Sequence, residues 1–405
     1  MTLLTAGLVI LISYSLYTPL PSEINEPGLA RTYIAAFKTA NFLAYTVELF
    51  TTFHHVNVIR WLVNVVYSPV LTRYSDITVE NLNFNGIPVR LYRPSSVTDL
   101  TPCIVYFHGG GWILFSVDTY DLLTSELSRS TNTIVIAVDY RKPPEYPYPY
   151  PFDDCLRATQ HVLQNGQQYL IDVNRVAVAG DGAGGNLAAA VALRLSEEDP
   201  TYTPHIKLQV LIQPALQALS FDTPSYRQNA VNTLVGRTQM ILFWCHYLDV
   251  QPTQGTINSF QSNQHLSPSI KNSIYSLYIS ELQLPECIKI NYIPSSLARH
   301  CPDYDKQLAQ KLESKVVDPF LSPLMADNLS KLPRAYVLVS EYDVLRDDGL
   351  LYASRLRQAN VPVVLRYVRD QMQGFMAPAM FSDYFKFTAA NVTWYEVYEY
   401  INLNL

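Results

Sequence analysis

The stretch RVAVAGDGAGGNLAAAVAL, residues 175–193, constrains the fold more than any other part of the chain. Its first half is a short valine-rich apolar run, which predicts a strand buried on both faces. Its second half is rich in alanine and leucine, which predicts a helix. Glycines crowd the junction, so the chain turns sharply between the two elements. The stretch therefore predicts one strand–turn–helix unit of an α/β fold.

The same alternation of strands and helices runs through most of the chain. Asn85-Gly86 separates two alternating runs and predicts a hairpin ahead of the first buried strand. Apolar runs predict strands at 103–110, 132–140, 206–214, 335–343 and 363–370, and helical spacing predicts helices at 153–164, 347–359 and the chain end. Repeated units of this kind predict a mostly parallel central sheet with helices on both faces.

The predicted organisation has one anchor-like segment and one large α/β domain. The chain has 405 residues and is 48% hydrophobic, which is ample for a large core. Residues 1–20 form an apolar N-terminal segment, and 21–74 read as a helical part of a cap, with helical spacing over 27–68. The α/β domain spans 75–405 and is interrupted at about 216–318 by an insertion poor in strands. This insertion and the N-terminal helices are expected to form a lid.

The first residues carry no charged side chain before Glu23, and Leu3 to Tyr17 form an apolar run. Such a run is short for a membrane-spanning helix, which needs about 17–25 residues, and long for a cleavable signal, whose apolar part has about 7–15. An uncleaved signal-anchor, a cleaved signal peptide and a buried first helix compete. The segment around Ser13-Tyr14-Ser15 matches the cleavage pattern poorly, which favours the anchor. An anchor or a signal sends the rest of the chain into the secretory lumen, where Asn328 and Asn391 would be acceptors for N-glycosylation.

Composition excludes some functions. The net charge is −6, charged residues are 16% of the chain, and no basic run is present, so we expect no nucleic-acid partner. The five cysteines include no pair or Cys/His cluster at zinc spacing, and no metal or cofactor is expected. Cys103 and Cys155 lie in apolar segments and are interpreted as buried. Cys287 and Cys301 are candidates for a disulfide, which the sequence leaves open.

A glycine loop follows the strand at 103–110. The block HGGGW comprises His108, Gly109, Gly110, Gly111 and Trp112. Successive glycines let backbone N–H groups approach a ligand oxygen closely, as an oxyanion hole requires. The alternative is a loop that only turns the chain. The motif stands about 70 residues ahead of the strand–turn–helix unit, and this pairing favours the oxyanion hole.

Gly180 to Gly184 match the G-x-S-x-G elbow pattern, except that Gly182 stands at the serine position. Asp343 follows a later strand, where an acid that orients a catalytic histidine would stand; the alternative is a carboxylate at a helix end or paired with Arg346. Gln373 occupies the loop after the last strand, where the base is expected. None of the eight histidines follows Asp343.

Two further acids, Asp347 and Asp348, are interpreted as residues of a helix start rather than as catalytic residues.

Several blocks in order carry a resemblance: YTPLPSEI, HGGGW, DYRKPPEYPYPYPFDDC, GDGAGGNLAAAVALR, SPLMADNLSKLPRAYVLVSEYDVLRDDGLLYA and QGF. The chain resembles the arylacetamide deacetylase branch of the hormone-sensitive-lipase-like α/β-hydrolases, whose members cleave esters or amides with apolar acyl groups. The resemblance implies an α/β-hydrolase fold with a helical cap. It also implies a single pass through the endoplasmic reticulum membrane with a luminal domain; the alternative is a secreted protein.

The resemblance also assigns site positions. It implies that the family serine falls on Gly182, the acid on Asp343 and the histidine on Gln373, with oxyanion donors at Gly109–Gly111 and Ala183. The places of a family disulfide hold Ile113 and Ser340 instead.

This pattern leaves three hypotheses. Gly182 offers no nucleophilic atom, and Gln373 cannot carry a proton away at neutral pH. The first hypothesis is a non-catalytic member that binds an apolar ester-like or lipid-like small molecule, or an unidentified protein partner, as the related plant gibberellin receptors bind a ligand after losing the histidine. The second is an active carboxylesterase or deacetylase with another nucleophile; Asp181 is adjacent, but we expect its side chain to point away from the pocket. The third is a decayed product with a residual fold.

Overall fold

The computed structural model describes residues 18–67, 74–197, 206–231, 233–289, 304–377 and 387–405. The expected anchor at 1–20 therefore lies almost entirely outside the described residues. Among the residues described, no helix is long and apolar enough to cross a membrane.

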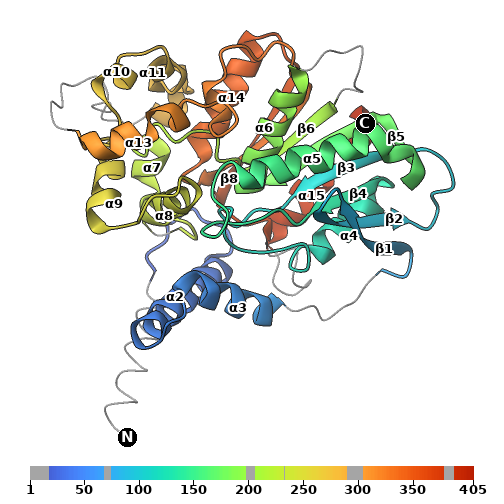
Figure 1. Cartoon of the computed structure of the whole chain (residues 1–405), viewed down its shortest axis with the longest axis horizontal. Coiled ribbons are helices and arrows are strands. Elements are labelled where there is room, and N and C mark those ends of the chain that lie inside the picture. The colour runs from blue at the N-terminus through green and yellow to red at the C-terminus, as the bar shows by residue number, and fades with distance from the viewer. Residues whose placement is uncertain (1–17, 68–73, 198–205, 232, 290–303, 378–386) are drawn as a thin grey trace, which may run out of the picture.

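One eight-stranded sheet runs through the molecule, with the strand order β1-β2-β4-β3-β5-β6-β7-β8 (Figure 1). The hairpin strands β1 and β2 pair with each other antiparallel, as does β2 with β4, and every pairing from β4 to β8 is parallel. The strands are β1 Ile77–Phe84, β2 Ile87–Pro94, β3 Thr101–Phe107, β4 Ile134–Val138, β5 Ile171–Asp181, β6 Ile206–Ile212, β7 Arg334–Tyr342 and β8 Val363–Met372. The predicted mostly parallel sheet and its leading hairpin are confirmed.

Helices cover both faces of the sheet, as predicted. Residues of α5, α6 and α14 join one hydrophobic cluster, and residues of α4 and α15 join the other. Within β3, Val105 and Phe107 face the first cluster, whereas Ile104 and Tyr106 face the second. This alternation explains the continuous apolar run in the sequence. The bounds are α4 Asp121–Thr131, α5 Tyr150–Asn165 with the 3₁₀ turn η1 Gly166–Tyr169, α6 Ala183–Ser196, α14 Arg346–Gln358 and α15 Thr388–Asn404.

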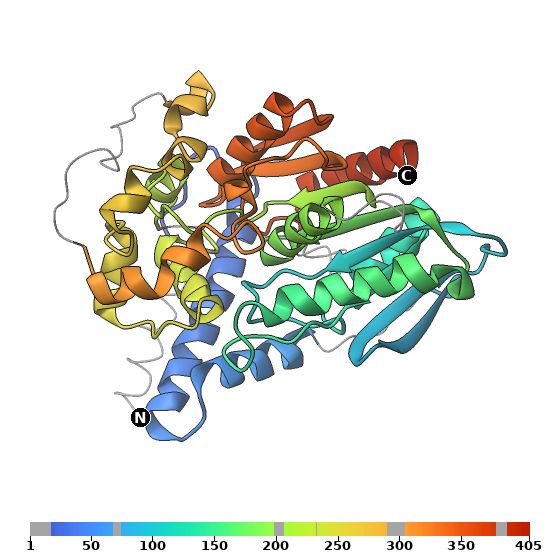
Figure 2. The same ribbon diagram turned by 45° about the horizontal axis from the view of Figure 1, so that its top comes forward.

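Helices also form the two parts expected to make a lid. The N-terminal pair α2 Pro27–Phe50 and α3 His55–Tyr67 projects from the α/β body in Figure 1. Figure 2 shows the insertion beside the same end of the body. Its described elements are α7 Pro224–Gln228, α8 Arg237–Tyr247, α9 Gln254–Gln261, α10 Pro268–Lys271, α11 Tyr275–Tyr278, η2 Glu281–Gln283, α12 Glu286–Lys289 and α13 Lys306–Val316, followed by η4 Pro323–Met325.

Several predicted boundaries were wrong by a few residues, for local reasons. The strand predicted at 103–110 ends at Phe107, because Gly110 and Gly111 adopt positive φ. The strand predicted at 206–214 ends at Ile212, because Gln213 also has positive φ. The helix predicted from 153 begins at Tyr150, with proline in its first turn, where a missing N–H costs nothing.

The cysteines fit the prediction where they are described. Cys103, Cys155 and Cys245 are buried and free. The proposed pairing of Cys287 with Cys301 lies outside the described residues. Ile113 and Ser340 are both buried.

Candidate active site

The turn between β5 and α6 has the backbone geometry of a nucleophile elbow. Gly182 has φ 53° and ψ −111°, a conformation that side chains of L-residues rarely adopt. Its N–H donates to Ile212 O at 2.9 Å, and its carbonyl accepts from the N–H of Ala215 at 3.2 Å and of Asn186 at 3.1 Å. A Cβ atom at Gly182 would meet no atom within 4 Å. The elbow therefore has room for a side chain at position 182, but the glycine there has none.

The flanking glycines, Gly180 and Gly184, allow α6 to pack closely against the end of β3. A Cβ atom on Gly184 would overlap the carbonyl oxygen of Phe107 and come within 2.7 Å of that of His108. A Cβ atom on Gly180 would come within 2.6 Å of the same Phe107 oxygen. These two glycines are required for packing, whereas Gly182 is required only by its torsion angles.

The glycine loop after β3 faces this elbow with unpaired N–H groups. Gly110 and Gly111 have φ of 93° and 62°, which suit glycine. In the described part of the chain, the N–H groups of Gly110, Gly111 and Ala183 donate to no protein acceptor. The N–H of Gly109 donates instead to the Tyr120 hydroxyl at 3.1 Å. Three of the four proposed oxyanion donors are thus free to bind a ligand oxygen.

His108 is buried and helps to hold the glycine loop in place. Its Nδ1 lies 2.9 Å from Gly109 O, and its ring stacks on Tyr140 at 4.4 Å. Burial lowers the pKa of His108 to about 3, so the imidazole is neutral. We therefore interpret His108 as a residue that stabilises the loop rather than as a catalytic base.

Asp181, next to the elbow, is held by two tyrosines. Its carboxylate oxygens accept from the hydroxyls of Tyr106 at 2.9 Å and Tyr120 at 2.8 Å. Burial raises its pKa to about 6, although the hydrogen bonds from the two tyrosines act to lower it. Because Tyr120 also accepts from Gly109, this network joins the elbow to the glycine loop.

Asp343 follows β7 and is fully buried. Its Oδ1 accepts from the Leu345 N–H at 2.8 Å, whereas its Oδ2 has no partner among the described residues. Arg346 pairs with Asp347 instead, at 3.0 Å, so the alternative of an Arg346-paired Asp343 is wrong. The alternative of a helix-end carboxylate agrees with the structure, because Asp343 accepts from Leu345, which directly precedes α14. Burial raises the pKa of Asp343 to about 8.

Gln373 follows β8 at the neighbouring strand end. Tyr342 pairs with Met372 in the sheet, and the Gln373 N–H donates to Tyr342 O at 3.2 Å. Gln373 is 9% exposed, and its Oε1 has no partner in the described part of the chain. The strand ends thus bring positions 343 and 373 together, with an unpaired carboxylate oxygen and an unpaired amide oxygen.

The sequence did not reveal Gln213 as a residue that organises this site. Its side chain donates to Met372 O at 3.3 Å and accepts from the Gly374 N–H at 2.9 Å. It also donates to the Ser340 hydroxyl on β7. Gln213 thereby holds the loop that carries Gln373. The only signal was a polar residue at the end of a buried apolar run.

Asp347 and Asp348 lie in the first turn of α14, as predicted, but they also bind the insertion. Asp347 accepts from the Ser225 N–H at 2.7 Å, and Asp348 accepts from Leu216 N–H and Gln217 Nε2, each at 3.0 Å. Burial raises the pKa of Asp348 to about 7. These bonds attach the start of the cap to the helix behind Asp343.

Aromatic side chains of α8 lie on the glycine loop. Trp112 stacks on Tyr247 with ring centroids 4.3 Å apart and packs against Trp244 at 4.5 Å. A Cβ atom on Gly111 would overlap the Phe243 ring. From the N-terminal helices, Arg60 on α3 donates to Ile113 O at 2.8 Å. Both helical parts therefore contact the loop that carries the candidate oxyanion donors.

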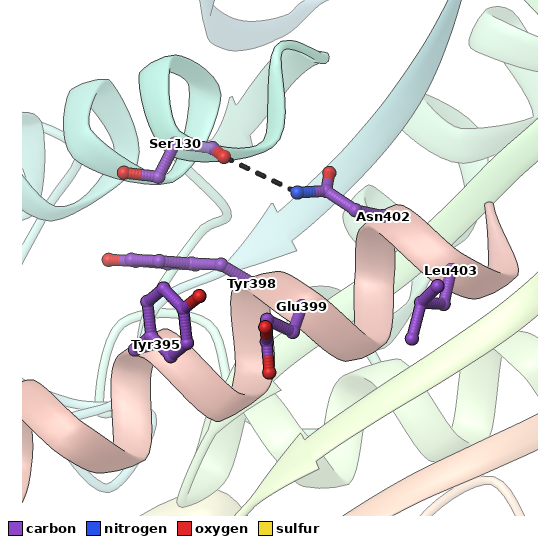
Figure 3. Close-up of a pocket in the computed structure, with 6 residues that line it drawn as sticks. All are labelled: Ser130, Tyr395, Tyr398, Glu399, Asn402 and Leu403. Atoms are coloured by element: carbon purple, nitrogen blue, oxygen red, sulfur yellow. Dashed lines mark hydrogen bonds between the residues drawn. The ribbon is translucent and has the colours of Figure 1, made fainter.

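A separate surface hollow lies between α15 and α4. Its volume is about 440 Å³. Figure 3 shows Asn402 donating to Ser130 O, at 3.5 Å, across its edge. The lining residues are Ser130, Tyr395, Tyr398, Glu399, Asn402 and Leu403. None of them is a predicted site residue.

Replacing Gly182 by serine is expected to lower the free energy of unfolding by about 1 kcal/mol, because serine at positive φ is strained although its side chain has room. Urea denaturation of the parent and of Gly182→Ser measures this difference. Gly182→Ala should lose a similar amount, since the strain arises at Cβ. A serine variant as stable as the parent would contradict the prediction.

The pH dependence of stability should reveal a neutral Asp343. Its pKa rises from 3.8 to about 8 on folding, so the folded chain holds a proton that the unfolded chain releases in this window. The parent therefore loses stability as the pH rises between these values. Asp343→Asn should gain stability relative to the parent with rising pH, by up to about 1.4 kcal/mol per pH unit.

Thermal unfolding from about pH 5 to about pH 8 measures this effect, within the window that the pKa change sets. Asn keeps the acceptor for the Leu345 N–H. The control is Asp249→Asn, at an aspartate whose side chain is 69% exposed. Parallel curves for the parent and Asp343→Asn would show that Asp343 is already charged.

The sheet order, the elbow after β5, the glycine loop after β3 and the acid after β7 define the α/β-hydrolase fold. The profile of a family described as having the alpha/beta hydrolase fold matches residues 104–270 and 292–377.

Known proteins align along most of the chain. Arylacetamide deacetylase from Bos taurus is 36% identical over 375 residues, covering 91% of this chain and 92% of the bovine protein. Neutral cholesterol ester hydrolase 1 from Rattus norvegicus is 32% identical over 384 residues, covering 92% of each. The crystal structure of a thermostable esterase from Pseudomonas putida is similar with a TM-score of 0.64 and 25% identity, covering 91% of this chain and 97% of that one. This chain belongs to the arylacetamide deacetylase family of α/β-hydrolases.

Proposed function

We propose that this protein binds an apolar ester-like or lipid-like small molecule at the elbow and does not hydrolyse it. The proposal rests on the residues at the positions where a nucleophile and a base would stand, Gly182 and Gln373. Gly182 has the torsion angles of a nucleophile elbow and no side chain, and Gln373 stands beside the acid without a basic atom. Acyl transfer on this scaffold needs both groups.

The remaining parts of the site favour ligand binding over loss of all function. Within the described residues, Gly110, Gly111 and Ala183 keep unpaired N–H groups, and Asp343 is in place with an unpaired oxygen. The central apolar runs of the parallel strands β3 to β7 contain no charged residue, which a degraded scaffold would tend to acquire. The names of the relatives, a deacetylase of arylacetamides and a hydrolase of cholesterol esters, support an apolar ester-like ligand.

An active esterase with another nucleophile is the second candidate, and Asp181 is the nearest group. Both of its carboxylate oxygens already accept hydrogen bonds from tyrosine hydroxyls, which reduces their nucleophilicity toward a substrate carbonyl. Ser340 is buried and bonded to Gln213. Neither residue has a base beside it, so neither is activated.

Ligand binding is tested on the full chain in lipid nanodiscs with dansyl-undecanoic acid as the probe. Energy transfer to the dansyl group from Trp112 and Trp244, which lie at the glycine loop, reports probe held next to the site. Gly182→Phe is expected to abolish the transfer, because its ring would fill the open space at the elbow. The matched control is Gly86→Phe in the β1–β2 hairpin, where the glycine also has a positive φ, of 92° against 53° at Gly182, and open surroundings.

Saturable transfer that only Gly182→Phe removes supports the proposal. Equal transfer in the parent and in Gly182→Phe, or no transfer in the parent, would overturn it. Turnover of p-nitrophenyl butyrate by the parent would show instead that the protein is an active esterase.

The proposal includes a location at a membrane, in the lumen of the endoplasmic reticulum. The apolar run from Leu3 to Tyr17 supports an anchor, and Thr18, where the described chain begins, lies 3.0 Å from Lys38 Nζ on α2. The same helix pair exposes large apolar side chains: Leu49 79%, Phe50 84%, Phe53 64%, Trp61 62% and Val65 57%. An apolar face next to an anchor favours contact with the lipid surface. Asn328 and Asn391 are both exposed, as glycan acceptors must be.

Trp61 provides a direct test of this location. In vesicles with brominated acyl chains, the full chain should lose part of its tryptophan fluorescence, because Trp61 is exposed on the apolar face. Trp61→Phe should remove the quenched component, since Trp112, Trp244 and Trp394 are buried. Quenching that is unchanged in Trp61→Phe, or absent in the parent, would contradict a lipid contact of α2 and α3.

A further inference from the structure

A compact group of metal-ligating side chains lies where the N-terminal helices meet the cap, away from the elbow. Glu48 lies near the end of α2, His54 directly precedes α3, and His55 is its first residue; each places one ligand atom within 4.8 Å of the others. His55 Nδ1 lies 3.0 Å from Glu48 Oε2, and His54 Nε2 lies 3.9 Å from Glu48 Oε1. The two imidazoles stack at 4.4 Å.

His246 brings a third imidazole from the cap helix α8. Its ring centroid lies 6.2 Å from that of His54 and 5.9 Å from that of His55. His246 is 9% exposed and the His55 side chain 15% exposed, whereas the side chains of Glu48 and His54 are 36% and 45% exposed, so the cluster has one buried and one open side. Residues 48–55 and residue 246, which are far apart in sequence, thus contribute to one group.

The donor set suits a borderline divalent cation. Imidazole nitrogens with one carboxylate are typical zinc ligands at about 2.0–2.2 Å, in tetrahedral geometry. Such ligand atoms lie about 3.3 Å apart, a separation that follows from these bond lengths. Glu48 Oε1 lies 3.2 Å from His55 Nδ1 and 3.9 Å from His54 Nε2, so a modest movement of the His54 ring brings these three ligand atoms onto one ion, and a rotation of the His246 side chain would add the fourth.

The protonation states are compatible with an ion. An imidazole with the ordinary pKa of about 6.5 is mostly neutral at pH 7 and keeps a lone pair for a metal ion. His54 Nδ1 accepts a long hydrogen bond of 3.3 Å from the Val56 N–H. Metal binding at Nε2 would place the proton on Nδ1 and break that bond. The loss is small, because Val56 lies in the first helical turn, where N–H groups lack helical partners.

We propose that Glu48, His54 and His55, with His246 as the fourth ligand, form a binding site for a zinc-like divalent cation that fastens the α2–α3 helices to the cap. The consequence reaches the candidate active site through α8. His246 precedes Tyr247, which stacks on Trp112 of the glycine loop. A bound ion therefore stiffens the helix that lies on the oxyanion donors. The proposal does not depend on whether the elbow hydrolyses or only binds its ligand.

The test uses the full chain in detergent, without a polyhistidine tag and stripped with a chelator. Co²⁺ alone is the probe, because its visible absorption distinguishes tetrahedral from octahedral coordination. The expected result is one tetrahedral Co²⁺ per chain, displaced by Zn²⁺. His55→Ala and His246→Ala should each weaken binding at least about tenfold, as the loss of a ligand does. The matched control is His161→Ala, whose ring stacks on Phe84 outside the cluster.

Thermal unfolding gives a second measurement. Saturating Zn²⁺ should raise the midpoint of the parent and of His161→Ala, but not that of His55→Ala. Absence of stoichiometric binding, or binding unchanged in His55→Ala, would overturn the site. Binding unchanged in His246→Ala would overturn the fastening of the cap, and a strong near-ultraviolet thiolate band would place the ion on cysteines instead.

Discussion

The Gly182→Ser/Gln373→His variant is expected to hydrolyse p-nitrophenyl butyrate at least about 10³-fold faster than the parent, which should remain near the background rate. The reason is that the two substitutions supply the only two groups the site lacks. A serine Cβ at the elbow meets no atom within 4 Å, so its hydroxyl stands free above α6.

The acid and the oxyanion donors are already in place for that reaction. An imidazole at position 373 lies at the strand end next to Asp343, whose Oδ2 has no partner among the described residues. Asp343 is neutral in the parent, and the imidazole N–H at position 373 would favour its ionised form. The resulting aspartate would stabilise the imidazolium formed when the base takes the serine proton. The N–H groups of Gly110, Gly111 and Ala183 would then bind the oxyanion.

Matched variants separate this mechanism from a chance gain of activity. Gly182→Ser and Gln373→His alone should each stay close to the parent, because nucleophile and base act as one unit. Adding Asp343→Asn to the double variant should reduce its rate by about 10⁴-fold or to background, as loss of the orienting acid does elsewhere. A folded but silent double variant would show that the substrate does not reach the elbow. A parent as active as the double variant would refute the non-catalytic proposal.

Gly184→Ala is expected to destabilise the protein by about 3 kcal/mol, enough to reduce the yield of soluble chain. Its Cβ would overlap Phe107 O and come within 2.7 Å of His108 O. Both are backbone atoms at the end of β3, and the pairing of β3 with β4 and β5 holds that strand in place. The clash therefore cannot be relieved by a side-chain rotation.

Gly182→Ala is the matched control, two residues away in the same turn. Its Cβ meets open space, so only the backbone strain of about 1 kcal/mol remains. Urea denaturation and the soluble yield of the two variants measure the difference. Equal losses for the two alanines would mean that α6 can move away from β3, contrary to the packing described here.

Local patterns predicted the elements of the fold well. Asn85-Gly86 lies at the turn between β1 and β2, and the valine-rich runs form strands buried on both faces. The errors are at boundaries. The start of β5 at Ile171 was missed because Asp172, Asn174 and Arg175 interrupt its apolar run. The start of α5 at Tyr150 was missed because prolines usually indicate loops.

The sequence also predicted the separate pieces of the site. The glycine loop, the elbow and the acid each follow an apolar strand, and the carboxyl ends of parallel strands lie at one edge of a sheet. What the sequence could not show is which groups those residues contact. Asp347 and Asp348 bind the start of the cap, and Gln213 holds the loop of Gln373 over a separation of more than 150 residues. These contacts depend on how distant segments pack.

By itself, the sequence determined the α/β alternation, the glycines at the turns, and the absence of a nucleophilic or basic side chain at positions 182 and 373, because each of these is a property of a residue and its neighbours along the chain. Only the tertiary structure decided that the Cβ position of Gly182 is open and that of Gly184 is closed. It alone also showed that an oxygen of Asp343 has no partner among the described residues, and that the ring of His246 lies 5.9–6.2 Å from those of His54 and His55 beside Glu48. Space and proximity at these places are set by segments that are far apart in sequence and that meet only when the sheet, the cap and the N-terminal helices pack together.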